Sequence, residues 1–212
     1  MIRAHFVGEL EALHQNLISL GDLTLKSVEQ CMRCLTKAAG ATYEQATELE
    51  SKIDDSSRFV HDRALGILIL QSPVAGDARL ITNILESVVD LEQIADYAYE
   101  ISDLAFQTDR RPTIQLLSQV VATGGKVHTM LMSALESWRQ LDRALGLSVR
   151  SREAPIRTDC HTLTERLYQL TSAQADAQVY VNLIFICKHF ERMARHIVYV
   201  AEQAASAAPP ER

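Results

Sequence analysis

The sequence is poor in the residues that interrupt helices, because its 212 residues include only 8 glycines and 5 prolines. It also has almost no stretches in which valine, isoleucine or threonine alternates with polar residues, as a half-buried strand would require. Leucine, alanine and glutamate, which favour helices, are plentiful. Since 47% of the residues are hydrophobic, we expect an all-α protein with a substantial core.

Positive charge and long apolar runs are also scarce. The formal net charge is −6 and no block of lysine and arginine occurs, which argues against nucleic-acid binding, because such binding depends on a basic patch. The longest apolar run, LGILIL at residues 65–70, is far too short to cross a bilayer. Acidic residues within the first eleven positions argue against a signal peptide. We expect a cytoplasmic protein without direct membrane insertion.

Motifs for catalysis are missing as well. The sequence has no evident nucleophile with a partner base, no glycine-rich loop to cradle phosphate, and no nucleotide-binding fingerprint. His189 and His196, with Arg192 and Tyr199 nearby, are a candidate polar cluster, but packed or exposed histidines outnumber catalytic ones on helices. We therefore expect a protein that acts through its surfaces and is not an enzyme.

The four cysteines do not form a clear metal-binding pattern. Cys31 and Cys34 form a C-x-x-C inside a helical stretch, whereas Cys160 and Cys187 lie far away without a second C-x-x-C. We expect all four to be small apolar residues in or near the core, and a zinc site is the less favoured alternative.

The periodicity of apolar residues predicts six long helices. Gly40 is placed to end the first helix, and QSPVAGD at residues 71–77 is a break with Asp77 as the cap of the helix that follows. The polar segment QTDRRPT at residues 107–113 indicates a linker. The expected helices span residues 4–38, 42–70, 77–106, 113–145, 153–172 and 176–206.

The pattern restarts after the linker, which indicates an internal duplication. Sliding the chain against itself by 99 positions aligns apolar positions with one another and also aligns polar residues. The identities are Asp77 with Asp176, Ala78 with Ala177, Asn83 with Asn182, Glu92 with Glu191, and Ala95 with Ala194. We predict two tandem antiparallel three-helix bundles, the first at residues 1–108 and the second at residues 109–212.

Two pairs of acidic residues fall at helical spacing in the first half. Glu50 and Asp54 lie four apart on the second helix, and Glu92 and Asp96 lie four apart on the third. If these helices fold back about Pro73, the two pairs come level. Four converging carboxylates need a cation, and hard oxygen ligands suit iron, manganese or magnesium. The alternative is a solvated acidic face, partly neutralised by Lys52 or Arg58.

A second alternative is a ferritin-like bundle with a carboxylate-bridged metal and redox activity. That class requires an E-x-x-H motif on each of two helices. The candidate motif joins Glu11 to His14, and no second one is evident beside the acidic residues. His14 is therefore expected to be an ordinary surface or partly packed histidine.

The segment ALGILILQSPVAGDARLITNILESVVDLEQIADYAYEI resembles the signature of the PhoU family of phosphate-uptake regulators. Ala78 stands where the family usually has leucine, and Gln93 where it has arginine. The matching residues are Gln71, Pro73, Val74, Ala75, Asp77 and Arg79, followed by Asp90, Leu91, Glu92, Ile94 and Asp96. The resemblance implies tandem three-helix bundles with acidic motifs that hold multinuclear iron or another metal, and Glu50, Asp54, Glu92 and Asp96 match one such set.

The resemblance also implies a function and partners. PhoU-like proteins restrain phosphate uptake and phosphate-starvation signalling by contacting the ATPase of the phosphate ABC transporter and a sensor histidine kinase, and the broad apolar faces here permit a homodimer. The second half departs from the family pattern, because Glu191 is followed by Arg195 where an aspartate is usual, and its level partners are expected near Arg150 and Glu153. We therefore expect at most one metal cluster, in the first half, with an ion pair such as Glu153 to Arg195 in the second.

Overall fold

The computed structural model describes residues 2–107, 114–171 and 177–209. Over these residues the chain is helical and contains no strand, in agreement with the all-α expectation. Helices α1 to α7 and one 3-10 turn, η1, follow one another along the chain. Their bounds are α1 Ile2–Leu35, α2 Tyr43–Gln71, α3 Ala75–Phe106, α4 Ile114–Gln140, α5 Arg143–Val149, η1 Arg150–Arg152, α6 Glu153–Thr171 and α7 Ala177–Ala207.

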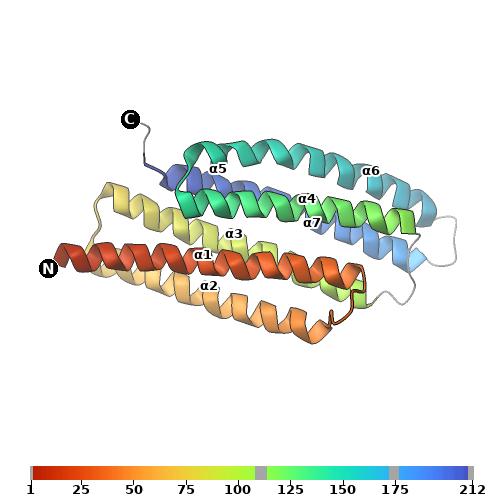
Figure 1. Ribbon diagram of the computed structural model, residues 1–212, viewed down its shortest axis with the longest axis horizontal. Coiled ribbons are helices and arrows are strands. Elements are labelled where there is room, and N and C mark those ends of the chain that lie inside the picture. Colours follow the sequence, from red (N-terminus) through yellow and green to blue (C-terminus); the bar gives the residue numbers. More distant parts are fainter. Residues whose placement is uncertain (1, 108–113, 172–176, 210–212) are drawn as a thin grey trace.

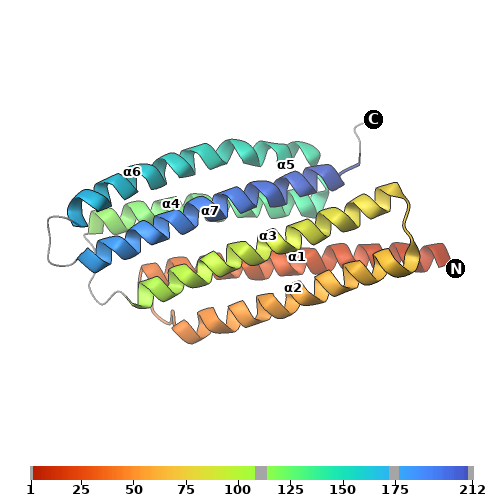
Figure 2. The same cartoon turned by 180° about the vertical axis from the view of Figure 1, so that it is seen from behind.

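The long helices form two antiparallel three-helix bundles that pack side by side (Figure 1). Helices α1, α2 and α3 form the first repeat, and α4, α6 and α7 form the second. Helix α3 packs along α7 and α1 packs against α4, so these four helices share one core while α2 and α6 lie on the outside (Figure 2). The tandem arrangement is confirmed, whereas the predicted boundary between residues 108 and 109 lies outside the described residues.

Local signals explain most of the helix ends. Helix α1 stops before Lys37 and Gly40, which both have positive φ, as expected for the glycine. A capping box starts α2. The Thr42 hydroxyl accepts a hydrogen bond from the backbone N–H of Gln45 at 3.3 Å, and the Gln45 side chain accepts one from the backbone N–H of Thr42. The cap predicted for α3 was wrong: the helix begins at Ala75, so Asp77 lies in its first turn, where its charge still favours the helix dipole.

The expected single helix over residues 113–145 was also wrong, because α4 ends at Gln140 and α5 begins at Arg143. Leu141 takes a left-handed conformation with φ of 48°, and the Asp142 carboxylate caps α5 by accepting from the Leu145 amide at 2.9 Å. Gly146 then lies against α7, where an added Cβ would meet the Ala201 carbonyl oxygen at 2.6 Å. Helix α5 can approach α7 this closely only with glycine at that position.

Trp138 joins the two repeats inside the shared core. Its side chain on α4 is fully buried, and its indole N–H donates to the Val200 carbonyl oxygen on α7 at 3.0 Å. Its own carbonyl oxygen lies 2.9 Å from Nε2 of His14 on α1. Three helices from both repeats therefore meet at one residue, and His14 is a partly packed histidine, as expected.

The four cysteines are buried and free, which agrees with their predicted role as core residues. Burial raises the pKa of Cys160 and of Cys187 to about 12. These thiols are therefore protonated near neutral pH in the metal-free protein.

Candidate functional site

Four carboxylates gather between α2 and α3, and we call Glu50, Asp54, Glu92 and Asp96 the acidic quartet. Asp54 precedes the end of α2 at Gln71 by the same length of chain as Glu92 follows the start of α3 at Ala75, so the two helices bring them level. All four side chains are half-buried. The hairpin argument from the sequence therefore places these residues correctly.

The members of the acidic quartet influence one another electrostatically. Burial raises the pKa of Asp96 to about 6, and the negative charges of the other three carboxylates and of Glu100 contribute to this shift from its ordinary value. Burial and the charge of Asp54 likewise raise the pKa of Glu50. The quartet therefore resists becoming fully ionised, which is what an acidic site without a counter-ion does.

The cations expected to neutralise this face point elsewhere. Lys52 pairs with Glu48 at 2.6 Å, and Arg58 pairs with Asp55 at 3.7 Å, both on the exposed side of α2. Among the described residues, Asp96 accepts a hydrogen bond from a neutral group, because Gln93 donates its side-chain amide N–H to Oδ2 at 2.9 Å. Neutralisation by Lys52 or Arg58 was therefore the wrong expectation for the solvated-face alternative.

The donor chemistry of the acidic quartet suits a hard cation, but its present side-chain positions do not form a finished site. Within the described residues, no three Asp, Glu, His or Cys side chains converge closely enough to hold one ion. Carboxylates from facing helices would bind iron, manganese or magnesium only after their side chains turn toward a common point. Glu50, Asp54, Glu92 and Asp96 thus remain predicted ligands. The candidate motif of the ferritin-like alternative, Glu11 to His14, does not join them, because His14 contacts Trp138 instead.

The raised pKa of Asp96 predicts a pH-dependent stability difference for Asp96→Asn in metal-free buffer. Because the folded protein holds this proton up to about pH 6 while an unfolded aspartate releases it near 3.8, wild-type stability falls as pH rises through that window. The asparagine side chain does not ionise, so the variant does not lose stability in this way as pH rises. We expect the variant to be more stable by about 1 kcal/mol above pH 7, allowing for solvent screening, and to match wild type below pH 4.

Thermal unfolding with a chelator present, followed at both pH values, measures this difference. Asp55→Asn, on the exposed side of α2, is the matched control and should show no such pH dependence. An Asp96→Asn variant less stable than wild type at pH 8 would contradict the electrostatic account.

A second polar cluster spans the interface between α3 and α7, where the sequence had indicated His189 and His196. His196 Nδ1 lies 2.7 Å from Asp90 Oδ1, and His189 Nδ1 lies 3.1 Å from Glu100 Oε2 without hydrogen-bond alignment. The Tyr97 ring lies between the two histidines, with centroid separations of 5.5 and 5.8 Å. The cluster therefore links the two repeats through paired groups.

Two further residues named from the sequence complete this cluster. The Arg192 guanidinium lies over the Tyr97 ring at 5.8 Å from its centroid, and the Tyr199 ring meets the His196 ring edge to face. Burial lowers the pKa of His189, which keeps it neutral near pH 7 and weakens its attraction to Glu100. The sequence missed Asp90 and Glu100 as partners, because contacts between distant helices leave no local pattern.

In the second repeat, the position that corresponds to the acidic quartet carries different charges. Glu191, which aligns with Glu92, pairs with Lys188 at 2.9 Å. These two residues on α7 face α6 across a cavity of about 270 Å³. We call this cavity the basic hollow, and it is lined by Arg157, Thr158, His161, Thr162, Lys188 and Glu191.

The positions expected to be level with Glu191, near Arg150 and Glu153, were wrong by more than one helical turn. The expected ion pair of Glu153 with Arg195 does not form among the described residues. Glu191 follows the start of α7 at Ala177 by the same length of chain as Arg157 precedes the end of α6 at Thr171, so these two residues come level. The connection between α6 and α7 is longer than the connection between α2 and α3, so the first repeat does not set the register of the second. Arg150 instead pairs with Glu202 at 2.5 Å.

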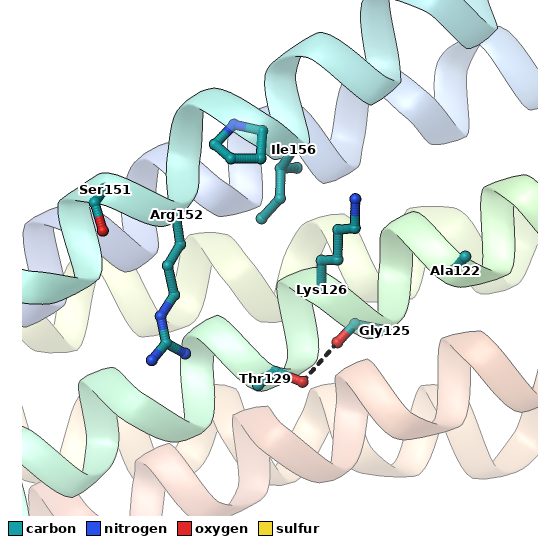
Figure 3. A pocket seen from close by; sticks show the side chains of 8 residues that line it. Ala122, Gly125, Lys126, Thr129, Ser151, Arg152 and Ile156 are labelled. Carbon is teal, nitrogen blue, oxygen red and sulfur yellow. Dashed lines mark hydrogen bonds between the residues drawn. The ribbon is translucent and has the colours of Figure 1, made fainter.

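A larger cavity of about 450 Å³ opens between α4 and the η1–α6 junction (Figure 3). Lys126 and Arg152 flank it, with Ile156 between them. Both cations already have partners, because Lys126 pairs with Asp159 at 2.5 Å and Arg152 donates to the Ser133 hydroxyl at 2.8 Å. The Ser133 hydroxyl is neutral, so it leaves the charge of Arg152 uncompensated, whereas Asp159 compensates that of Lys126.

These features define a class of protein: an all-helical protein built from two tandem three-helix repeats that share one core. A sequence model described as the PhoU domain matches residues 17–105 and 121–204, which covers both repeats. The chain belongs to the PhoU family.

Curated relatives support this placement over nearly the full chain. The chain is 29% identical over 207 residues to the phosphate-specific transport system accessory protein PhoU homolog of Synechocystis sp., covering 96% of this chain and 91% of the relative. It is 28% identical to the homolog of the same name from Pseudomonas aeruginosa, covering 95% and 84%.

Solved structures show the same architecture. The crystal structure of PhoU from Pseudomonas aeruginosa superposes with a TM-score of 0.90 at 27% identity and covers 95% of this chain and 98% of its own. The phosphate transport system regulatory protein PhoU from Streptococcus pneumoniae has the same fold, with a TM-score of 0.87 at 21% identity over 95% and 96% of the two chains. In the described part of our chain, no helix is both long and apolar enough to pass through a bilayer.

Proposed function

We propose that this protein regulates phosphate transport by binding other proteins. The observation that carries the proposal is the match of both repeats to the PhoU domain. The matched residues, 17–105 and 121–204, include helices of both three-helix bundles. Relatives that align with 95% and 96% of the chain are named accessory proteins of the phosphate-specific transport system. Their names describe accessory or regulatory roles, which supports a non-enzymatic function here as well.

The proposed partners are the ATPase of a phosphate ABC transporter and a sensor histidine kinase, both contacted from the cytoplasm. A regulator of this kind restrains uptake and signalling by binding one state of its partner better than another, which shifts the population of states without chemistry. A homodimer is a further proposal, supported by large apolar side chains that remain exposed on α2 and α7. The redox alternative has no second E-x-x-H motif to support it.

One exposed apolar surface is well placed for a partner, at the turn between α2 and α3. Ile69, Leu70 and Val74 are 76%, 80% and 72% exposed, and Leu65 extends the surface along α2. We call these four residues the apolar tip. Exposed apolar side chains that gather in one part of a surface mark interaction sites.

The test measures association of the purified protein with the purified transporter ATPase and with the cytoplasmic part of the kinase. We expect Ile69→Asp/Leu70→Asp to weaken binding at least roughly tenfold, because two large apolar side chains lose their burial at the interface. Leu147→Asp/Phe185→Asp is the matched control, since both residues are about half exposed in the second repeat. If wild type binds neither partner, at high or at low phosphate, the proposed function is wrong.

A further inference from the structure

The charge of the basic hollow is opposite to that of the acidic quartet, which occupies the corresponding position in the first repeat. The acidic quartet presents four carboxylates, whereas the hollow presents the Arg157 guanidinium, the Lys188 ammonium and the His161 imidazole with one carboxylate, Glu191. A cation would be repelled by Arg157 and Lys188. The same position in the duplicated fold therefore suits an anion.

The groups that face the basic hollow have donors to spare. Arg157 is exposed, and in the described part of the chain no carboxylate lies within ion-pair distance of it. Lys188 has Glu191 as its partner, which leaves two of its three N–H groups available to a ligand. The Thr162 hydroxyl lines the same cavity from the next turn of α6. A guanidinium, an ammonium and a hydroxyl are the donors that proteins use for tetrahedral oxyanions.

We propose that the basic hollow binds free inorganic phosphate, so that the second repeat senses phosphate. The choice of phosphate among oxyanions rests in part on the proposed function, and in part on Glu191. A carboxylate inside an anion site repels sulfate, which carries no proton at neutral pH. Phosphate retains at least one P–O–H under the same conditions and can donate it to Glu191. Lys188, already in contact with Glu191, and Arg157 together place two positive charges opposite the carboxylate and the phosphate.

Phosphate in this site would bridge α6 and α7, the outer and inner helices of the second repeat. Arg157 and Thr162 belong to α6, while Lys188 and Glu191 belong to α7. Helix α7 also carries the polar cluster that faces α3. A ligand that ties α6 to α7 therefore acts on the helix that joins the two repeats.

Calorimetric titration of the full chain with inorganic phosphate, in low-salt buffer with a chelator, tests the proposal. We expect binding by wild type and a loss of affinity of at least roughly tenfold in Arg157→Gln/Lys188→Gln, because two charge-assisted contacts are removed. Lys52→Gln/Arg58→Gln removes the same charges from exposed positions on α2 and should bind like wild type. Absence of binding by wild type, or an equal loss in the control, would overturn the assignment.

Titrations with other anions test whether the ligand of the site is free inorganic phosphate. Wild type should prefer phosphate to sulfate, and Glu191→Gln should narrow that preference by improving sulfate binding. Equal affinity of wild type for the two anions, or tighter binding of glucose 6-phosphate than of inorganic phosphate, would show that free phosphate is not the ligand. These titrations contain no transporter protein, so an absence of phosphate binding would not contradict the proposed function. Likewise, an absence of partner binding would not contradict phosphate binding by the basic hollow.

Discussion

Trp138→Ala is expected to lower the free energy of unfolding by about 3–5 kcal/mol, because it removes a fully buried indole and leaves a cavity between the repeats. For a chain of this length, that loss corresponds to a decrease in melting temperature on the order of 10 °C. The indole N–H also bonds to the Val200 carbonyl oxygen on α7, and this bond disappears with the ring. The expected effect is larger than that of any surface change in the molecule.

The same experiment tests whether the two repeats unfold together. Trp138 on α4 contacts α7 of its own repeat, and its backbone carbonyl receives His14 from the other repeat. Because α1, α3, α4 and α7 share one core, we expect a single cooperative transition in wild type and in the variant. Thermal and urea denaturation followed by circular dichroism measure both the loss and the number of transitions.

Trp138→Phe is the matched control, since it keeps an aromatic ring but removes the indole N–H. We expect Trp138→Phe to lower the free energy of unfolding by less than half as much as Trp138→Ala does. If Trp138→Ala unfolds within about 1 kcal/mol of wild type, or if the first repeat keeps its own separate transition, the shared core does not couple the repeats in the way the packing indicates.

The helices and the acidic quartet were predictable because their signals are local or follow from one turn. Glycine, proline and the capping box mark most helix ends, and the short turn at Pro73 fixes the register of α2 against α3. Counting residues back from that turn was enough to bring Asp54 level with Glu92. The family resemblance rests on the same stretch of sequence.

The parts that could not be predicted depend on packing between distant segments. The break at Leu141 contains neither glycine nor proline, and it is stabilised by the Asp142 cap and by the contact of Gly146 with α7. The basic hollow was missed because the register of α6 against α7 cannot be copied from the first repeat. Its residue types were visible in the sequence, but their convergence was not.

Glu92→Gln/Asp96→Asn is expected to abolish metal binding by the acidic quartet. The substitution keeps the size of both side chains and removes half of the negative charge that would hold a hard cation. Protein purified without chelators or metal-affinity resin should contain iron, manganese or magnesium by mass spectrometry, and the variant should contain none. The matched control is Glu191→Gln, at the equivalent position of the second repeat, which should keep the metal because the basic hollow repels cations.

The pH dependence of metal content distinguishes ligation by the acidic quartet from loose surface adsorption. Since the pKa of Asp96 is raised to about 6, protons compete with the metal for this carboxylate below that pH, and wild type should lose metal between pH 7 and pH 5. Equal metal loss in Glu92→Gln/Asp96→Asn and in Glu191→Gln would contradict the asymmetry between the repeats. Metal absent from wild type as well would make the quartet a proton-sharing carboxylate cluster, and the regulatory role would then depend on partner contacts and on the anion site of the second repeat.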